Sequence, residues 1–239
     1  MRVSDGKIQR AYRIRITIFL ASVLLTVGVL STVYQAIRTL DRLEVVERDR
    51  DKWQRPADIL QALDLRQGNV VADIGSGAGY FTLKLSSVVG KGGTVLAVDI
   101  QRLPLIFLRI RALLHNQHNI RAVHGKPDDP KLARPVDAVL IVNAYHEFAD
   151  PQRILECIVH SLRPGGRLVI ADRGPRSNEG QTRESEARNH EMPPNLLESE
   201  LLHSGFELVK REDRFVDPPE DRPWWLIVVR KPKESRPLR

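Results

Sequence analysis

Five short apolar runs, rich in Val and Ile and bounded by Gly, Pro, Asn or Asp, dominate the chain beyond Trp53. Runs of this length and composition are typical of parallel strands that are buried on both faces of a sheet. They occupy residues 69–75, 93–100, 119–125, 136–143 and 166–173. Helix patterns lie between them at 78–90, 102–116 and 150–162. This alternation predicts a doubly wound α/β sheet with right-handed crossovers.

Two further strand patterns close the domain. A helix pattern ends at Gly205, and runs at 206–215 and 223–231 follow it, separated by a proline-rich turn. A turn between two such runs indicates antiparallel pairing. We therefore predict a mostly parallel, seven-stranded Rossmann-like sheet with an antiparallel C-terminal strand, in a domain at 53–231. The polar segment 173–193 is expected to form a loop or cover at one edge of the sheet.

An uncharged run of 21 residues, Ile16 to Ala36, lies near the N-terminus. A helix needs about 20 apolar residues to cross the hydrocarbon core of a bilayer, so we predict one N-terminal transmembrane helix at 16–37. A basic tail at 1–15 precedes it, a charged linker helix at 38–52 follows it, and a disordered tail at 232–239 ends the chain. A cleaved signal peptide and a buried helix of a soluble domain stay open as alternatives. Basic residues flank both ends of the run, so the positive-inside rule does not decide its orientation.

The net charge of +7 raises the question of a nucleic-acid partner, and its distribution argues against one. Residues 1–55 carry 11 Lys and Arg against 6 Asp and Glu, and the rest of the chain carries 26 against 24. The basic excess therefore belongs mainly to the N-terminal segment, and no nucleic-acid partner is predicted. A single cysteine, Cys157, excludes an internal disulfide and a cysteine-rich metal site, and no metal site is predicted.

Three glycines at alternate positions, Gly75, Gly77 and Gly79, follow the first strand run in the sequence DIGSGAGY that starts at Asp73. In an open α/β sheet, ligands bind at the carboxyl ends of strands near the switch in strand order, and glycine lets the backbone approach a ligand closely. A dinucleotide fold expects Gly-x-Gly-x-x-Gly, but here Tyr80 takes the sixth motif position. The stretch resembles instead the Asp/Glu-x-Gly-x-Gly-x-Gly form of the class I S-adenosylmethionine-dependent methyltransferases.

The resemblance implies a cofactor site for S-adenosyl-L-methionine at the strand ends. Its implied residues are Asp73, Gly75, Gly77, Gly79, Tyr80, Asp99, Ile100, Asp128, Asp129 and Asn143. Asp99 ends the second strand, where a carboxylate accepts both hydroxyls of a ribose, and a cap of the following turn is the open alternative. Asp128 and Asp129 follow the third strand, where an acidic or amide side chain commonly meets the adenine amino group in this class. An ordinary polar turn before Pro130 is the open alternative for this pair.

Two later segments narrow the resemblance. VLIVNAYHEF and LRPGGRLVIADR resemble the small-molecule branch that includes the ubiquinone and menaquinone C-methyltransferases. The chain lacks the Asn-Pro-Pro-Tyr motif that is typical of methylation on nucleic-acid bases, and it lacks the paired-glutamate loop of the arginine methyltransferases. The resemblance covers about residues 53–231 and implies a small-molecule acceptor, for which the predicted anchor suggests a lipophilic one.

The candidates for catalysis, His146 and Tyr145, directly follow the fourth strand. Because the sulfonium makes its methyl group electrophilic, the protein's main task is to align a nucleophile, and a base matters only if that nucleophile must lose a proton. His146 is the candidate base, since an unperturbed histidine titrates near about pH 6.5. Tyr145 is a second catalytic candidate that is expected to line the cleft. His190 with Glu191 is a candidate to close over the substrate, and a purely structural role is the alternative for His146.

These observations predict a membrane-anchored S-adenosylmethionine-dependent methyltransferase that acts on a small acceptor. Since the cofactor is a cytosolic metabolite, the catalytic domain is expected to face the cytoplasm. Two alternatives from other classes stay open. One is a catalytically inactive, membrane-tethered module that binds the cofactor. The other is an NAD-type oxidoreductase, which the glycine spacing disfavours.

Overall fold

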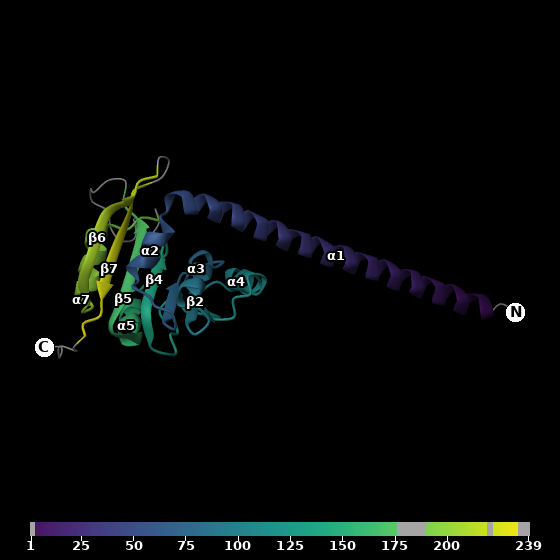
Figure 1. The fold of residues 1–239 in the computed structure, drawn as a ribbon. Helices are drawn as coiled ribbons and strands as arrows, with labels where there is room; N and C mark the ends of the chain where they lie inside the picture. The colour runs from purple at the N-terminus through teal and green to yellow at the C-terminus, as the bar shows by residue number, and fades with distance from the viewer. Residues whose placement is uncertain (1–2, 176–189, 219–221, 234–239) are drawn as a thin grey trace. The chain divides into compact units, whose positions relative to one another are not determined.

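The computed structural model describes residues 3–175, 190–218 and 222–233. The chain divides into two units, Met1–Arg48 and Asp49–Arg239, which we describe separately. Helix α1 (Val3–Trp53), 51 residues long, supplies the described part of the first unit (Figure 1). By length and composition, its section Arg15–Trp53 is able to cross a membrane. A signal sequence near the N-terminus meets the same criteria of length and composition. The described residues of the segments predicted as tail, span and linker lie within this single helix, so their boundaries stay predictions.

The second unit is built on one seven-stranded sheet, as the sequence predicts. The strand order is β3-β2-β1-β4-β5-β7-β6, in which β1 to β5 run parallel and β7 lies antiparallel between β5 and β6. The strands are β1 (Val70–Ile74), β2 (Thr94–Asp99), β3 (Ile120–His124), β4 (Val136–Val142), β5 (Leu162–Arg173), β6 (Glu207–Val216) and β7 (Trp224–Arg230). The strand order switches direction between β1 and β4, where an open α/β sheet binds its ligand.

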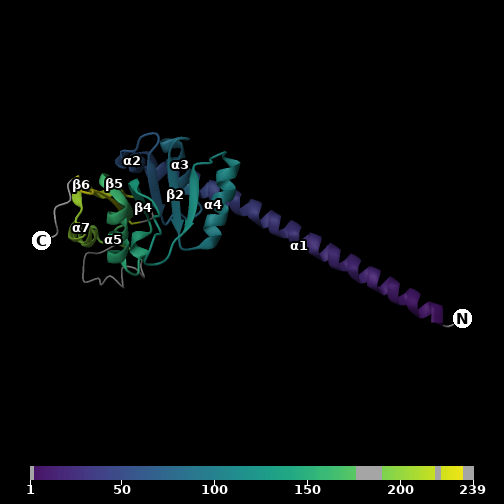
Figure 2. The same ribbon diagram turned by 90° about the horizontal axis from the view of Figure 1, so that it is seen from below.

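Helices cover both faces of this sheet (Figure 2). Side chains of α2 and α3 share one buried cluster with the sheet, and side chains of α5 and α7 share another on the opposite face. The helices are α2 (Pro56–Ala62), α3 (Tyr80–Val89), α4 (Arg102–Leu114), α5 (Pro151–Ser161) and α7 (Pro194–His203), with a 3-10 turn η1 (Tyr145–Glu147) after β4. Most of the predicted cover at 173–193 and of the predicted tail at 232–239 lies outside the described residues.

Helix α5 begins where the sequence predicts. The Asp150 carboxylate accepts a hydrogen bond from the Arg153 N–H at 3.0 Å, and proline occupies the first helical position, where no N–H is needed. The following strand is longer than predicted, because Leu162 already pairs with Val136. An irregularity in the pairing and a positive φ of 80° at Gly165 let the proline-glycine segment stay inside β5 instead of forming a separate loop.

The last turn of α1 belongs to the second unit and packs on it. Trp53 contacts Trp224 of β7 edge to face, with ring centroids 5.6 Å apart. Asp51 Oδ1 accepts a hydrogen bond from the Tyr80 hydroxyl at 2.7 Å, and the Arg50 guanidinium lies 4.0 Å from the centre of the Tyr80 ring. The contacts of Asp51 and Arg50 hold Tyr80, the first residue of α3, directly behind the glycine turn.

Candidate active site

A cavity of about 260 Å³ opens at the carboxyl ends of β1, β2 and β4. The turn after β1, the end of β2, the loop after β3 and the segment around η1 line it. This is the switch point of the sheet, and a concave lining with few polar groups is typical of small-ligand sites. Five of the predicted cofactor residues line the cavity: Gly75, Gly77, Asp99, Ile100 and Asn143.

The three glycines of the turn serve different purposes. All have positive φ, of 77° at Gly75, 53° at Gly77 and 97° at Gly79. A Cβ at Gly75 would overlap the Cβ of Ala144, and one at Gly79 would overlap the Leu108 side chain. A Cβ at Gly77 would have no atom within 4 Å. Packing therefore requires glycine at two positions, whereas the bare backbone of Gly77 faces space that a ligand is able to enter.

Asp99 and Asn143 bring polar groups to the cavity. The Asp99 carboxylate accepts hydrogen bonds from the N–H groups of Gly77 and Gln101, both at 2.8 Å. Asn143 has a positive φ of 54° and donates its backbone N–H to the Ala171 carbonyl. Its side-chain Oδ1 is buried and has no hydrogen-bond partner among the described residues. Since an unpaired buried acceptor is costly, this oxygen indicates a ligand that carries a hydrogen-bond donor.

A chain of polar side chains leads from β5 to the wall of the cavity. The buried His146 places Nδ1 at 2.9 and 3.0 Å from the two oxygens of Asp172, and Nε2 at 3.1 Å from His190 Nδ1. A carboxylate only accepts, so neutral His146 carries its proton on Nδ1 and presents a lone pair at Nε2. Glu147, which lines the cavity, has Oε1 at 3.7 Å from that Nε2 and 3.9 Å from His190 Nδ1.

Comparison with known proteins decides the family. A family profile described as a methyltransferase domain matches residues 72–168. A protein-L-isoaspartate O-methyltransferase of Anaeromyxobacter dehalogenans is 30% identical over 160 residues, which cover 58% of this chain and 71% of the relative. The chain belongs to the class I S-adenosylmethionine-dependent methyltransferases.

Further similarities agree with this class. The ubiquinone/menaquinone biosynthesis C-methyltransferase UbiE of Azotobacter vinelandii is 34% identical over 130 residues, covering 53% of this chain and 50% of the relative. The chain spans about half the length of the first curated relatives it matches. The crystal structure of a SAM-dependent methyltransferase from Aquifex aeolicus has the same fold, with a TM-score of 0.61, 21% identity, and coverage of 74% of this chain and 89% of that chain. The predicted class, its Rossmann-like fold and its cofactor are thereby confirmed.

The polar groups of the cavity suit those of S-adenosylmethionine. The cofactor carries a positive sulfonium, an ammonium group and a ribose with two hydroxyls. The Asp99 carboxylate supplies acceptors for hydroxyls, and the unpaired Oδ1 of Asn143 supplies an acceptor for an N–H group. The backbone at Gly77 offers an approach without a side chain. These residues would hold the cofactor, and the individual contacts stay predictions.

Two predicted residues, Asp73 and Tyr80, support the turn from behind and are absent from the described lining of the cavity. The buried Asp73 carboxylate accepts a hydrogen bond from the Thr82 hydroxyl at 2.5 Å. Burial raises the pKa of Asp73 to about 6, the nearby negative charge of Asp99 adds to the rise, and the Thr82 hydrogen bond opposes it. Tyr80 is engaged with the last turn of α1, as described above.

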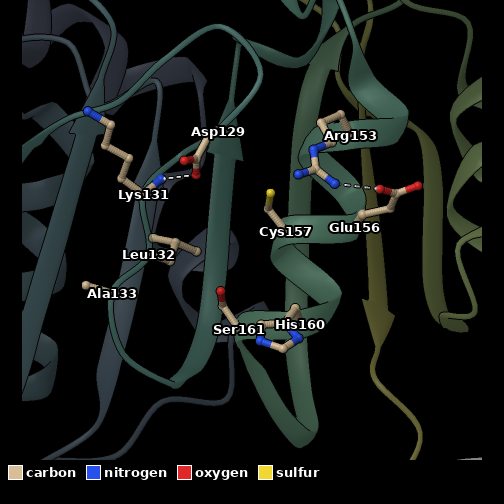
Figure 3. Close-up of a pocket in the computed structure, with 9 residues that line it drawn as sticks. All are labelled: Asp129, Lys131, Leu132, Ala133, Arg153, Glu156, Cys157, His160 and Ser161. Atoms are coloured by element: carbon tan, nitrogen blue, oxygen red, sulfur yellow. Dashed lines mark hydrogen bonds and ion pairs between the residues drawn. The ribbon is translucent and has the colours of Figure 1, made fainter.

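The predicted adenine contacts, Asp128 and Asp129, are not placed at this cavity. A tight turn joins Lys126 to Asp129, whose carboxylate accepts a hydrogen bond from the Lys131 N–H at 2.7 Å. Asp128 is exposed, and Asp129 lines a second cavity, of about 520 Å³, beside α5 (Figure 3). Lys126 lines the cofactor cavity instead, together with Pro127 and Pro130, and the sequence reasoning missed this lysine. Its only sequence signal is its place directly after β3.

The position of Tyr145 differs from the prediction that it lines the cleft. Its side chain is fully buried in the core, and its hydroxyl donates to Glu200 of α7 at 2.6 Å. Its ring packs on Phe148, with centroids 5.3 Å apart. The aromatic ring of Tyr145 thus fixes η1 against the sheet, which aims the next residue, His146, toward His190. The geometry favours a positioning role for Tyr145 over contact with a substrate.

The group formed by His146, Glu147 and His190 also has the donor types of a metal site. One ligand atom from each lies within 4.8 Å of the others, and imidazole and carboxylate groups bind divalent transition metals. Asp172 holds the far side of the His146 ring, as an outer carboxylate does in many such sites. The sequence predicts no metal here because Asp172 and His190 lie 26 and 44 residues from His146 and form no motif with it.

Proposed function

We propose that this methyltransferase is an active, membrane-anchored enzyme that transfers a methyl group from S-adenosylmethionine to a small, lipophilic acceptor. The observation that carries the proposal is the cavity at the carboxyl ends of β1 and β2. There a bare glycine backbone, a carboxylate and an unpaired amide oxygen converge beside the polar chain of His146. Groups for the cofactor thus lie in one cavity with Glu147, whose Oε1 is 3.7 Å from Nε2 of the candidate base His146.

In the proposed reaction the residues of this chain position the acceptor and remove its proton. The bound cofactor supplies an electrophilic methyl group on a positive sulfur. Bound in the cavity, S-adenosylmethionine would supply the methyl group and leave as a neutral thioether, and the proton that the acceptor loses would pass to Nε2 of His146, directly or through His190. Asp172 keeps the His146 proton on Nδ1 and stabilises the imidazolium that forms. Such proton transfer contributes about 10²- to 10⁴-fold in rate.

The acceptor class follows from the lining and from the anchor. Apolar side chains of Phe148, Ala149 and Ile154 face the cavity beside Glu147, so an apolar molecule with one polar reacting group suits it. The similar UbiE protein is described as a C-methyltransferase of ubiquinone and menaquinone biosynthesis, which supports the lipophilic assignment. The apolar helix α1 supports anchoring, and the cytosolic cofactor supports a domain that faces the cytoplasm. A reporter fused after Arg239 tests this topology, and an outward-facing domain would contradict it.

Calorimetry on the full chain in detergent tests the cofactor. Wild type is expected to bind S-adenosylmethionine, Gly77→Arg to lose binding because its side chain fills the ligand space, and Asp99→Ala to weaken it. Asp64→Asn is the matched control, since Asp64 is exposed and lies outside the described lining of the cavity. Wild type that binds no cofactor, or binds NAD in its place, would sink the proposal.

A catalytically inactive module is the second candidate, and transfer assays separate it from the enzyme. Labelled cofactor is incubated with the full chain and with lipid and aqueous extract fractions. Label that enters a lipid fraction with wild type, and far less with His146→Asn, is the expected outcome. Cofactor binding without label in any fraction favours the inactive module. Metal analysis of the purified chain distinguishes a free base from a metal-held His146.

A further inference from the structure

Helix α4 carries an apolar stripe on its outward face. The inward side chains Leu105 and Leu108 pack on Ala97 of β2. The outward stripe consists of Leu103, Ile106, Ile110, Leu113 and Leu114, which are 64%, 50%, 36%, 70% and 70% exposed. At 3.6 residues per turn these positions fall within an arc of about 100°. A contiguous exposed row of large aliphatic side chains on a stable domain indicates an interaction surface.

The charged residues of the segment that carries this stripe are all basic. Residues 100–127 contain no Asp or Glu, although the domain as a whole is nearly neutral. Arg102 and Arg109, seven residues apart, are exposed and border the stripe along one side. Arg121 on the neighbouring strand β3 is exposed as well, and β3 is the edge of the sheet (Figure 2). The surface therefore offers an apolar row beside a basic margin.

The stripe begins at the mouth of the cofactor cavity. Ile100 and Pro104, at the start of α4, line that cavity, and Ile100 is also 52% exposed. A molecule that lies against the stripe is thus adjacent to the reaction space. A lipophilic acceptor needs a route of this kind because it is poorly soluble in water.

We propose that α4 and the adjoining edge of β3 dock on the surface of an anionic lipid bilayer. Aliphatic side chains beside arginines match the boundary between acyl chains and negative headgroups. The other occupant would be a second copy of this chain. A two-fold contact through α4 would bring the arginines of both copies together, with no carboxylate in residues 100–127 to pair them. The proposal rests on the membrane location given above, and methyl transfer is not needed for it.

Spin labels on the full chain in vesicles test the docking. Cys157→Ala removes the native thiol, and Leu113→Cys adds a label on the stripe. Glu156→Cys, on the exposed face of α5, is the matched control. In vesicles of phosphatidylcholine with phosphatidylglycerol, the label at 113 is expected to become shielded from a water-soluble relaxant and open to oxygen. The label at 156 is expected to stay open to water.

Three further variants sharpen the result. Ile106→Glu is expected to abolish the shielding at 113 and to keep cofactor affinity, which shows that the domain is folded. Arg102→Gln and Arg109→Gln are each expected to lower the ratio of docked to free domain about fivefold, the value of one basic residue at an anionic surface. A label at 113 that stays open to water in these anionic vesicles overturns the proposal, and so does spin–spin coupling between copies that is independent of lipid. A chain that does not float with the vesicles overturns both docking and anchoring. Absent cofactor binding alone overturns only the enzymatic proposal.

Discussion

The two sides of the cavity are built in different ways. The glycine turn of the cofactor cavity is formed by consecutive residues after β1, in which backbone conformation does most of the shaping. The proposed catalytic group lies beside the cavity and is assembled from side chains on separate segments: His146, Asp172 and His190 are joined by hydrogen bonds, and Glu147 reaches the cavity wall. A backbone site tolerates substitution poorly but leaves a clear local motif. A site made of side chains from separate segments leaves no local motif in the sequence. Each of its side chains can be substituted singly while the fold is kept.

The comparison is tested most severely at Gly75. Gly75→Val is expected to lower the free energy of unfolding by about 3 to 5 kcal/mol, because the side chain overlaps Ala144 and φ is positive. Denaturant unfolding followed by tryptophan fluorescence measures this loss. Gly77→Ala is the matched control and should cost only about 1 kcal/mol, since its Cβ meets no atom within 4 Å. Equal losses for the two variants would contradict the division of roles among the glycines.

On the acceptor side, substitution should affect rate and leave cofactor binding intact. Asp172→Asn and His146→Asn are each expected to lower kcat about 10²- to 10³-fold with little change in the affinity for S-adenosylmethionine. The double variant should be no worse than either single one, because the two groups act as a unit. Tyr145→Phe removes only the hydrogen bond to Glu200, at about 1 kcal/mol of stability, and keeps most of the activity. If Tyr145→Phe lowers kcat as much as His146→Asn does, the Tyr145 hydroxyl takes part in catalysis.

The pH dependence of stability reports on Asp73. Its pKa is about 6 in the folded chain and about 3.9 in the unfolded chain, so the folded state binds the proton more tightly. The stabilisation is complete below about pH 3.9 and is lost as the pH rises through about 6, a change of about 3 kcal/mol. Asp73→Asn keeps an acceptor for Thr82 and removes this loss. Its stability relative to wild type, from unfolding at pH 4 and pH 8, should therefore increase at the higher pH. A constant difference would show that Asp73 is not perturbed.

The smallest effect is expected behind the turn. Tyr80→Phe removes the hydrogen bond to Asp51 and should cost about 0.5 to 1.5 kcal/mol of stability. The same substitution is expected to weaken cofactor binding by less than about tenfold, since the ring and its contact with Arg50 remain. Thermal shift with and without S-adenosylmethionine measures both quantities. A complete loss of binding would place the Tyr80 hydroxyl in the cofactor site itself.

Sequence reasoning succeeded where structure is local. The strand runs, the cap of α5 and the glycine turn depend on neighbouring residues, and all appear in the structure close to their predicted places. The proximity of Asp172 and His190 to His146 is not predicted from the sequence. It depends on the pairing of β4 with β5 and on the long segment that separates His146 from His190 in the chain. The loop after β3 misled the prediction for another reason. A turn of four residues from Lys126 reverses the chain and leaves Asp128 exposed.

The contacts of Arg50 and Asp51 with Tyr80 have a practical consequence for the design of a soluble fragment. A boundary drawn by homology at the start of the catalytic domain, near Trp53, would delete both side chains and leave the Tyr80 hydroxyl and ring without them. The compact unit itself starts at Asp49. A fragment that begins between Arg38 and Arg48 keeps the contacts of Arg50 and Asp51 with Tyr80 and omits the uncharged run. It is the version in which affinity for S-adenosylmethionine should match that of the full chain.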